Sequence, residues 1–269
     1  MPAWAKSMLA VGVMAALAAT TTWAADVEAF LAGDSRNCLA CDLAGQNLKA
    51  RDFKRAKLDR ANFKGADLSE TSLFRASLVR AQFAGAILKS ANLNLVDAKW
   101  ADFSDAIITD ALLFEADLSS ANLSRANLEN GRLGRARLNQ ANLAGAKLAN
   151  ADMRGARLAG AKLAGADMRR VKLDGQNLRG MDLRGIDFTM ADMPEADLTG
   201  ADLRGAILAG VDLYGANLNS ADLRGANFDG ANLNNAILTD AKLDGANFEA
   251  AIMPNGQRNE PQPKKETLR

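Results

Sequence analysis

Large apolar residues recur at every fifth position of this chain, from Leu43 to Met253, without an insertion. Of these 43 centre positions, 30 hold Leu, seven Phe, four Met, one Ile and one Ala, which is Ala98. Ala stands two residues before the centre in 32 of the 43 units, and polar residues fill most of the other positions. A period of five matches neither a helix nor a strand, so the pattern predicts a repeat architecture.

The simplest structure with this period turns one corner per unit. We expect the centre residue and the preceding Ala to point inward, so that four units close a square coil of about 20 residues. Coils stacked at about 4.8 Å make residues 20 apart neighbours. Phe63, Phe83 and Phe103 then share one internal ladder, and Phe228 and Phe248 another. The small Ala is needed because two bulky inward residues per corner would overfill so narrow a tube.

Corner residues are also visible in the sequence. Seventeen units carry Gly two residues after the centre, and most others carry a polar residue there. Gly adopts the positive φ that tight turns often need, so we expect a turn at each of these positions.

The run A-[DN]-L-x-x, as in Ala121-Asn122-Leu123 and Ala201-Asp202-Leu203, resembles the pentapeptide-repeat proteins over residues 41–253. This resemblance implies an all-β fold, a right-handed quadrilateral β-helix. The 43 units correspond to about 10–11 coils and to a rod on the order of 50 Å long. A filled rod of this kind has no interior pocket for a small-molecule substrate.

The N-terminal region has the features of an export signal. Lys6 precedes the apolar stretch 8–19, and Thr22-Trp23-Ala24 offers small residues to a signal peptidase. A transmembrane anchor is the alternative, but about 12 apolar residues are too few for a span of about 20. We therefore expect residues 1–24 to be a signal peptide cleaved near Ala24, and the mature protein to be an exported bacterial protein, periplasmic or secreted, without a membrane span.

Both ends of the predicted rod differ from the repeat. Residues 25–40 form the expected N-terminal cap, with a short helical turn whose Val27, Phe30 and Leu31 cover the first coil and which ends at Gly33. Residues 254–269 are rich in Pro and charge, and we expect them to be disordered. The last coil would then be poorly covered and is a candidate surface for end-to-end association.

The only two cysteines, Cys38 and Cys41, stand at inward positions of the first corner. A redox pair needs an accessible thiolate, usually at a helix N-terminus, and zinc normally needs four Cys or His ligands, whereas the chain has no His. An oxidising compartment favours a disulfide that locks the cap, which is the interpretation that we adopt. Two buried free thiols are the simpler alternative.

Charge alternates in blocks along the chain. The net charge is +5 over residues 41–100, −5 over 101–130, +8 over 131–184 and −8 over 185–253. Such blocks could guide self-association or dock a partner, or they could reflect drift in a duplicated repeat. Asp182, Asp202 and Asp222 align beside Arg184, Arg204 and Arg224, which predicts a solvated ion-pair network and not a ligand site.

Large apolar residues gather at outward positions between residues 74 and 114. The candidate interaction surface consists of Phe74, Ile87, Leu95, Trp100, Ile107, Leu112 and Phe114. Exposed apolar residues normally scatter, so a cluster indicates an interface. One alternative is that Trp100 folds inward through a bulge and fills the space left by Ala98.

These features bear on three classes of function. An enzyme is disfavoured because the chain has no His, no activated nucleophile in context, no phosphate loop and no metal-ligand set, so we expect no catalytic residue, metal or cofactor. Some pentapeptide-repeat proteins mimic DNA and protect a type II topoisomerase in the cytoplasm, but the charge here is balanced and the export signal argues against this alternative. We therefore expect an exported structural or protein-binding scaffold whose partner is a protein. A second copy that binds through the C-terminal coil or the apolar cluster is one candidate, and nucleic acid is not an expected partner.

Overall fold

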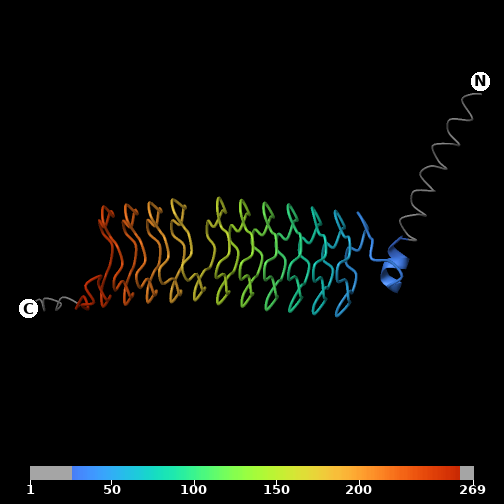
Figure 1. Cartoon of the computed structure of the whole chain (residues 1–269), viewed down its shortest axis with the longest axis horizontal. Coiled ribbons are helices and arrows are strands. Elements are labelled where there is room, and N and C mark those ends of the chain that lie inside the picture. Colours follow the sequence, from blue (N-terminus) through green and yellow to red (C-terminus); the bar gives the residue numbers. More distant parts are fainter. Residues whose placement is uncertain (1–25, 261–269) are drawn as a thin grey trace, which may run out of the picture.

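The computed structural model describes residues 26–260. Within them, a helix over residues 26–32 is followed by a stack of four-sided coils, drawn side-on in Figure 1. From Asn37 to Ile252, every fifth residue forms a parallel bridge with a residue 20 positions away, as Asp42 does with Asn62, and only two pairs of this ladder are missing. The 20-residue coil predicted from the period is confirmed. We number the four faces by their first bridged residue: face 1 by Asp42, face 2 by Asn47, face 3 by Asp52 and face 4 by Asn37.

The interior is filled by the two inward positions of each unit. Centre residues such as Leu123 and their partners such as Ala121 are buried almost completely, while the other three positions face solvent. The expected aromatic ladders are present: the ring centroids of Phe63 and Phe83 lie 4.8 Å apart, and those of Phe83 and Phe103 lie 4.7 Å apart. Like residues therefore stack on like residues, at the inter-strand spacing.

Each corner is one tight turn. The N–H of Ala56 donates to the carbonyl oxygen of Phe53 at 3.1 Å, and the same bond recurs in most units. The second residue after the centre has a φ between 55° and 71° in every unit from Gly45 to Ala250, which is the pattern of a type II turn. Glycine adopts this conformation freely, but Leu95 and Trp100 adopt it as well, at a cost of roughly 1 kcal/mol or more.

The helix caps the N-terminal end of the rod as expected. Phe30 is buried and its ring stacks on Phe53 at 4.6 Å, while Val27 and Leu31 pack against the same core. Gly33, with a φ of 89°, follows the end of the helix. The cap therefore supplies the apolar cover that an open coil needs.

Two predicted boundaries need correction. The β-helix begins at Asn37 and not at residue 41, because Cys38 already holds a buried centre position. The tail is not disordered from residue 254 onward: Met253 donates to the carbonyl of Gln257 at 2.8 Å, and Ile252 forms an antiparallel bridge with Arg258. Residues 254–260 thus fold back along the last rung, because its backbone groups are free to pair. The rest of the predicted tail, 261–269, and the predicted signal peptide, 1–24, lie outside the described residues.

The one defective centre is repaired locally. Ala98 is buried at a position that otherwise holds a large residue, and Val96 replaces the usual Ala two residues earlier. The large and small residues have exchanged places, so the total volume of the pair is nearly kept. Trp100 is therefore not needed in the core and remains 54% exposed, so the alternative of an inward bulge is wrong.

Candidate functional site

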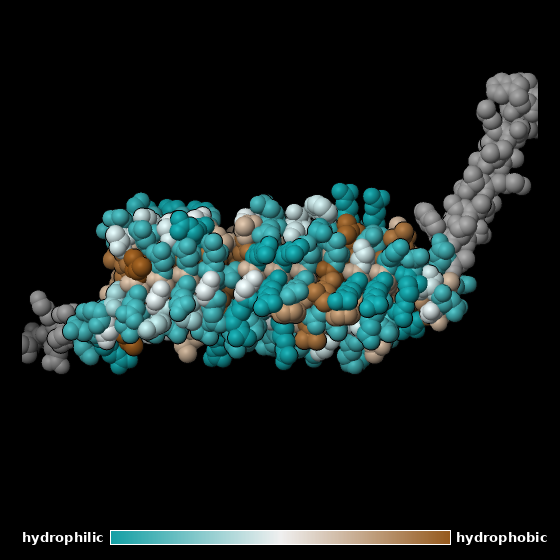
Figure 2. Space-filling model, viewed as in Figure 1, coloured by the Kyte–Doolittle hydropathy of each residue, from teal (hydrophilic) through white to brown (hydrophobic). Residues whose placement is uncertain are grey.

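The apolar cluster predicted from the sequence lies on faces 2 and 3 and at two corners: Phe74, Leu95 and Phe114 lie at the corner between faces 3 and 4, and Trp100 lies at the corner between faces 4 and 1. Ile87 and Ile107 are bridged neighbours on face 2, and Leu112 follows on face 3. Four of its seven members are exposed by 37–54% of their surface, namely Ile87, Trp100, Ile107 and Phe114, and the other three, Phe74, Leu95 and Leu112, are half-buried. Figure 2 shows brown apolar surface concentrated in the N-terminal half of the rod, with a smaller spot near the other end.

Arginines border this surface. The guanidinium carbons of Arg75 and Arg80 lie 5.2 Å and 5.7 Å from the ring centroids of Phe74 and Trp100. Contacts of this kind contribute about 0.5–1 kcal/mol at exposed sites. The cluster therefore presents aromatic rings next to positive charge, which suits a partner with apolar side chains flanked by carboxylates.

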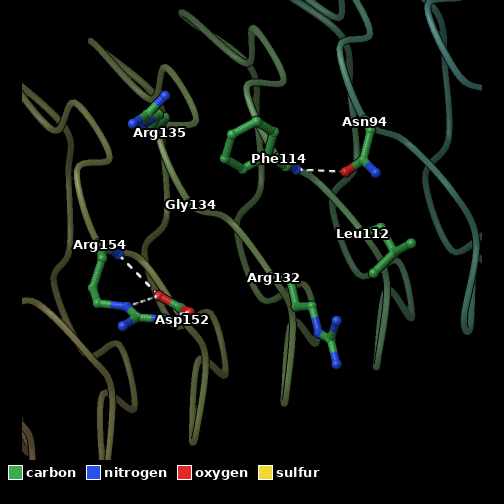
Figure 3. Close-up of a pocket in the computed structure, with 8 residues that line it drawn as sticks. All are labelled: Asn94, Leu112, Phe114, Arg132, Gly134, Arg135, Asp152 and Arg154. Carbon is green, nitrogen blue, oxygen red and sulfur yellow. Dashed lines mark hydrogen bonds and ion pairs between the residues drawn. The ribbon is translucent and has the colours of Figure 1, made fainter.

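A hollow adjoins Phe114 on face 3 (Figure 3). Its volume is about 540 Å³, and it exists because Gly134 interrupts a column of side chains that runs from Phe114 to Arg154. A Cβ atom at Gly134 would lie 3.4 Å from the Phe114 ring. In the view of Figure 3, Phe114 and Arg135 lie on one side of Gly134, and Arg132 and Asp152 lie on the other.

Some of the charged side chains around the hollow form ion pairs, and one does not. Arg154 binds Asp152 through both carboxylate oxygens, at 2.9 Å and 2.5 Å, and this hydrogen-bonded pair lowers the pKa of Asp152. Arg135 contacts Glu115 at 3.4 Å. Arg132 makes no ion pair with any residue in the described part of the chain. A carboxylate of a partner would find this guanidinium available beside an apolar ring.

Face 4 carries a closed charge network beside the cluster. Lys99 lies 2.9 Å from Asp97 and 3.4 Å from Asp117, which Arg137 also approaches at 3.5 Å. Burial raises the pKa of Asp117, but hydrogen bonds from Ser119 and the charge of Lys99 outweigh it, so the pKa lies below its usual value. Each charged group of this network has an oppositely charged partner within it, and we assign the network a structural role.

The aspartate and arginine columns form the predicted ion-pair network. Arg204 lies 2.7 Å from Asp202 in its own unit and 3.9 Å from Asp222 in the next coil, and Arg184 repeats this arrangement. Such exposed pairs contribute little individually. They do neutralise part of the acidic block over residues 185–253.

The first corner contains a disulfide. The sulfur atoms of Cys38 and Cys41 are bonded, and both residues are almost fully buried. The bridge follows the helix of residues 26–32 in the chain. Within residues 26–260 there is no group of three or more potential metal ligands and no helix long and apolar enough to cross a membrane.

Sequence reasoning missed a second apolar group and an irregular coil. Met190, Ile207 and Tyr214 are 55%, 41% and 43% exposed on consecutive coils. Ile207 stands in the same column as Ile87 and Ile107, so the 20-residue register could have found it. Gln176 and Met181 occupy inward positions that normally hold Ala, and this departure was equally visible in the sequence.

Comparison with known proteins identifies the repeat. The family model for pentapeptide repeats matches in eight copies, over residues 37–73, 68–105, 76–113, 99–135, 136–175, 177–210 and 216–253. The comparison with curated protein sequences gives no significant match.

Solved structures of pentapeptide repeat proteins are similar to the chain. HetL, from the cyanobacterium Nostoc sp. strain PCC 7120 and involved in regulating heterocyst differentiation, is 30% identical, with 86% of this chain and 97% of HetL covered and a TM-score of 0.33. A protein of the Arabidopsis thaliana thylakoid lumen is 31% identical over 37% of this chain and 70% of its own, with a TM-score of 0.37. QnrB1, a plasmid-mediated fluoroquinolone resistance protein, is 18% identical over 78% and 92%, with a TM-score of 0.47.

The matched repeats span nearly the whole stack of coils, and pentapeptide repeat proteins are generally non-catalytic structural or binding proteins. The fold is the right-handed quadrilateral β-helix of these proteins. The chain belongs to the pentapeptide-repeat family.

Proposed function

We propose that this protein is an exported, non-catalytic scaffold that binds a protein partner through the apolar cluster. The observation that carries the proposal is the position of the cluster: seven large apolar residues lie at outward positions within about two and a half coils of a rod whose interior is already filled. Exposed patches of this kind mark interfaces. Export rests on the N-terminal sequence alone.

The partner is expected to combine apolar and acidic side chains. Arg75, Arg80 and Arg135 lie over the three aromatic rings of the cluster, and Arg132 is available in the adjoining hollow. A partner with complementary charge would associate faster and would lose affinity as salt is added.

Cross-linking tests this interface. A photoreactive residue in place of Phe114 should give a defined adduct in the native compartment, and Phe74→Ser with Trp100→Ser should abolish it. The matched control is Ile237→Ser, since Ile237 is 48% exposed but lies near the other end. An adduct that survives the double substitution excludes the cluster as the interface. N-terminal sequencing of the mature protein tests export, and an intact Met1 would contradict it.

The C-terminal coil is proposed as a contact between two copies. Leu243, at a centre position, is 39% exposed, and Leu238 and Phe248 are only partly buried. Residues 254–260 cover one edge of this coil only. Leu243→Asp should convert a dimer to a monomer in light scattering, whereas a monomeric wild-type protein would refute this contact.

Topoisomerase protection by DNA mimicry is the weaker alternative. A mimic needs unpaired negative charge along the rod, but Asp202 and Asp222 are each paired with arginine. A supercoiling assay with gyrase and a fluoroquinolone decides between the two: protection by the purified mature protein would favour mimicry over the scaffold.

A further inference from the structure

The bridge ladder is interrupted on two adjoining faces. No bridge joins residues 157 and 177 on face 4, or residues 162 and 182 on face 1, although the flanking pairs Asp152 with Lys172 and Asp167 with Asp187 are formed. Figure 1 shows the coils spread apart at one side of the yellow segment and close together at the other. We call this wedge-shaped opening, between residues 155–165 and 174–184, the seam.

Overfilling of the core explains the opening. In the coil on the N-terminal side of the seam, the four inward positions that precede the centres all hold Ala. In the coil on the C-terminal side, the same positions hold the larger residues Val171, Gln176, Met181 and Ile186, and all four centres of that coil are large as well. Close-packed interiors accommodate extra volume only by moving backbone. Gln176 is 3% exposed, and its side-chain amide donates to the main-chain oxygen of Ala156, between the two coils.

The seam leaves backbone groups without a ladder partner. In the regular ladder just before the seam, the N–H of Leu138 donates to the main-chain oxygen of Arg157 at 2.8 Å, and the N–H of Gln140 donates to that of Ala159 at 2.9 Å. One coil higher, among the described residues, the N–H groups of Leu158 and Gly160 have no protein acceptor, and the oxygens of Asn177 and Arg179 have no protein donor. Leu163, Gly165, Asp182 and Arg184 repeat this pattern on face 1. The lip formed by residues 155–165 thus presents free donors, and the lip formed by residues 174–184 presents free acceptors, as unpaired strand edges do.

On face 4 the seam is a cleft of about 380 Å³, within the size range of ligand pockets, about 300–1,000 Å³. Its walls are apolar at Leu158 and Met181 and basic at Arg157 and Arg179. Arg179 forms an ion pair with Asp197 at 3.2 Å, whereas Arg157 has no ion pair among the described residues. The charge around the cleft is therefore positive.

We propose that the seam binds an extended acidic segment of a partner protein, which adds as a strand between the two lips. Its backbone would pair with the free groups of Leu158, Gly160, Asn177 and Arg179, and its carboxylates would reach Arg157 and Arg179. A strand inserted between the two lips needs them to be separated by about two strand spacings, roughly 10 Å. The wedge would therefore open further at the corner that contains Gly160, and the intact bridges at residues 152 and 167 would act as the hinge. This site is separate from the apolar cluster and does not depend on it.

Fluorescence anisotropy with a labelled Glu-Val-Glu-Val-Glu peptide tests the site on the full-length mature protein. Arg157→Glu should weaken binding at least about tenfold, while Arg132→Glu, which removes an equally unpaired arginine on face 3, should leave it unchanged. An N-methylated form of the peptide should bind at least tenfold more weakly, because it cannot complete the ladder. Equal binding of the N-methylated form, or of short single-stranded DNA, would overturn strand addition in favour of a general anion site.

Closing the seam supplies the second test. Gln176→Ala with Met181→Ala restores the inward residues of the coil on the N-terminal side, so the ladder should close, the amides of Leu158 and Gly160 should exchange at least about tenfold more slowly, and peptide binding should be lost. Undiminished binding by a closed variant refutes the proposal, as does slow exchange of these amides in the free wild-type protein. If the double variant does not fold, the Arg157→Glu and N-methyl results decide alone.

Discussion

The side-chain amide of Gln176 donates to the main-chain oxygen of Ala156, the atom that the N–H of Asn177 would contact in an unbroken ladder. In the regular part of the rod, the corresponding bond runs from Arg157 to Ala136 at 2.8 Å. One inward side chain has thus replaced a backbone bond. The rod is divided at this point into two stacks that are joined by backbone bridges on only two faces.

This division should be visible in unfolding. Repeat proteins unfold cooperatively only as far as neighbouring repeats are coupled, so a weak interface separates cooperative units. We expect hydrogen exchange in urea to show two blocks, on either side of residues 170–173, with different opening free energies. The Gln176→Ala, Met181→Ala variant should merge them into one block. A single block in the wild-type protein would show that the two closed faces suffice for coupling.

Gly205 tests the cost of the corner conformation. Its φ is 65°, and a Cβ atom there would meet no atom within 4 Å, so Gly205→Ala introduces backbone strain alone. We expect a loss of about 1 kcal/mol in the free energy of unfolding, measured by urea denaturation. Gly134→Ala is the control: Gly134 lacks a positive φ and the new Cβ makes an ordinary contact with Phe114. An equal loss for both variants would contradict this explanation.

Val96 and Ala98 test the exchange of large and small inward residues. Val96→Ala leaves a corner with two small residues and a cavity, so stability should fall by about 1–3 kcal/mol. Adding Ala98→Leu restores the usual arrangement and should recover most of the loss. Chemical denaturation of the two variants measures the recovery; if Ala98→Leu lowers stability further, the space is not shared between the two positions.

Asp192 should make the protein more stable in mild acid. Burial raises its pKa, and Asp174 and Asp212 raise it further. A folded pKa above the unfolded value means that the folded state binds the proton more tightly, so this group adds stability as the pH falls through its folded pKa toward 3.8. Asp192→Asn should therefore be more stable than the wild type at pH 7, and the difference should shrink near pH 3. A difference that does not change with pH would exclude titration of Asp192 as the cause.

Asp222 should have the opposite effect. The hydrogen-bonded Arg224 lowers its pKa to about 2, from 3.8. Its contribution is complete above pH 4 and is lost as the pH falls through about 2. Arg224→Gln removes the partner, so the acid unfolding midpoint should move to higher pH. Arg132→Gln, which breaks no ion pair, should leave this midpoint unchanged; equal shifts would indicate a general charge effect.

Much of the candidate site was predictable because the register converts sequence distance into position. Residues 20 apart are stacked, so Ile87 and Ile107 could be placed together, as could Phe63, Phe83 and Phe103. The exposure of Trp100 was not decidable in the same way. It depended on whether Val96 fills the space beside Ala98, which is a matter of packing volume.

The sequence by itself determined the coil, its period, the inward pair and the columns of like residues, because a five-residue pattern repeated 43 times admits one register. Only the tertiary structure decided where that register fails. Overfilling at Val171, Gln176, Met181 and Ile186 is readable in the sequence, but whether it compresses side chains or parts the backbone depends on the sum of contacts around the whole coil. Here the backbone parts on faces 4 and 1 and holds on faces 2 and 3.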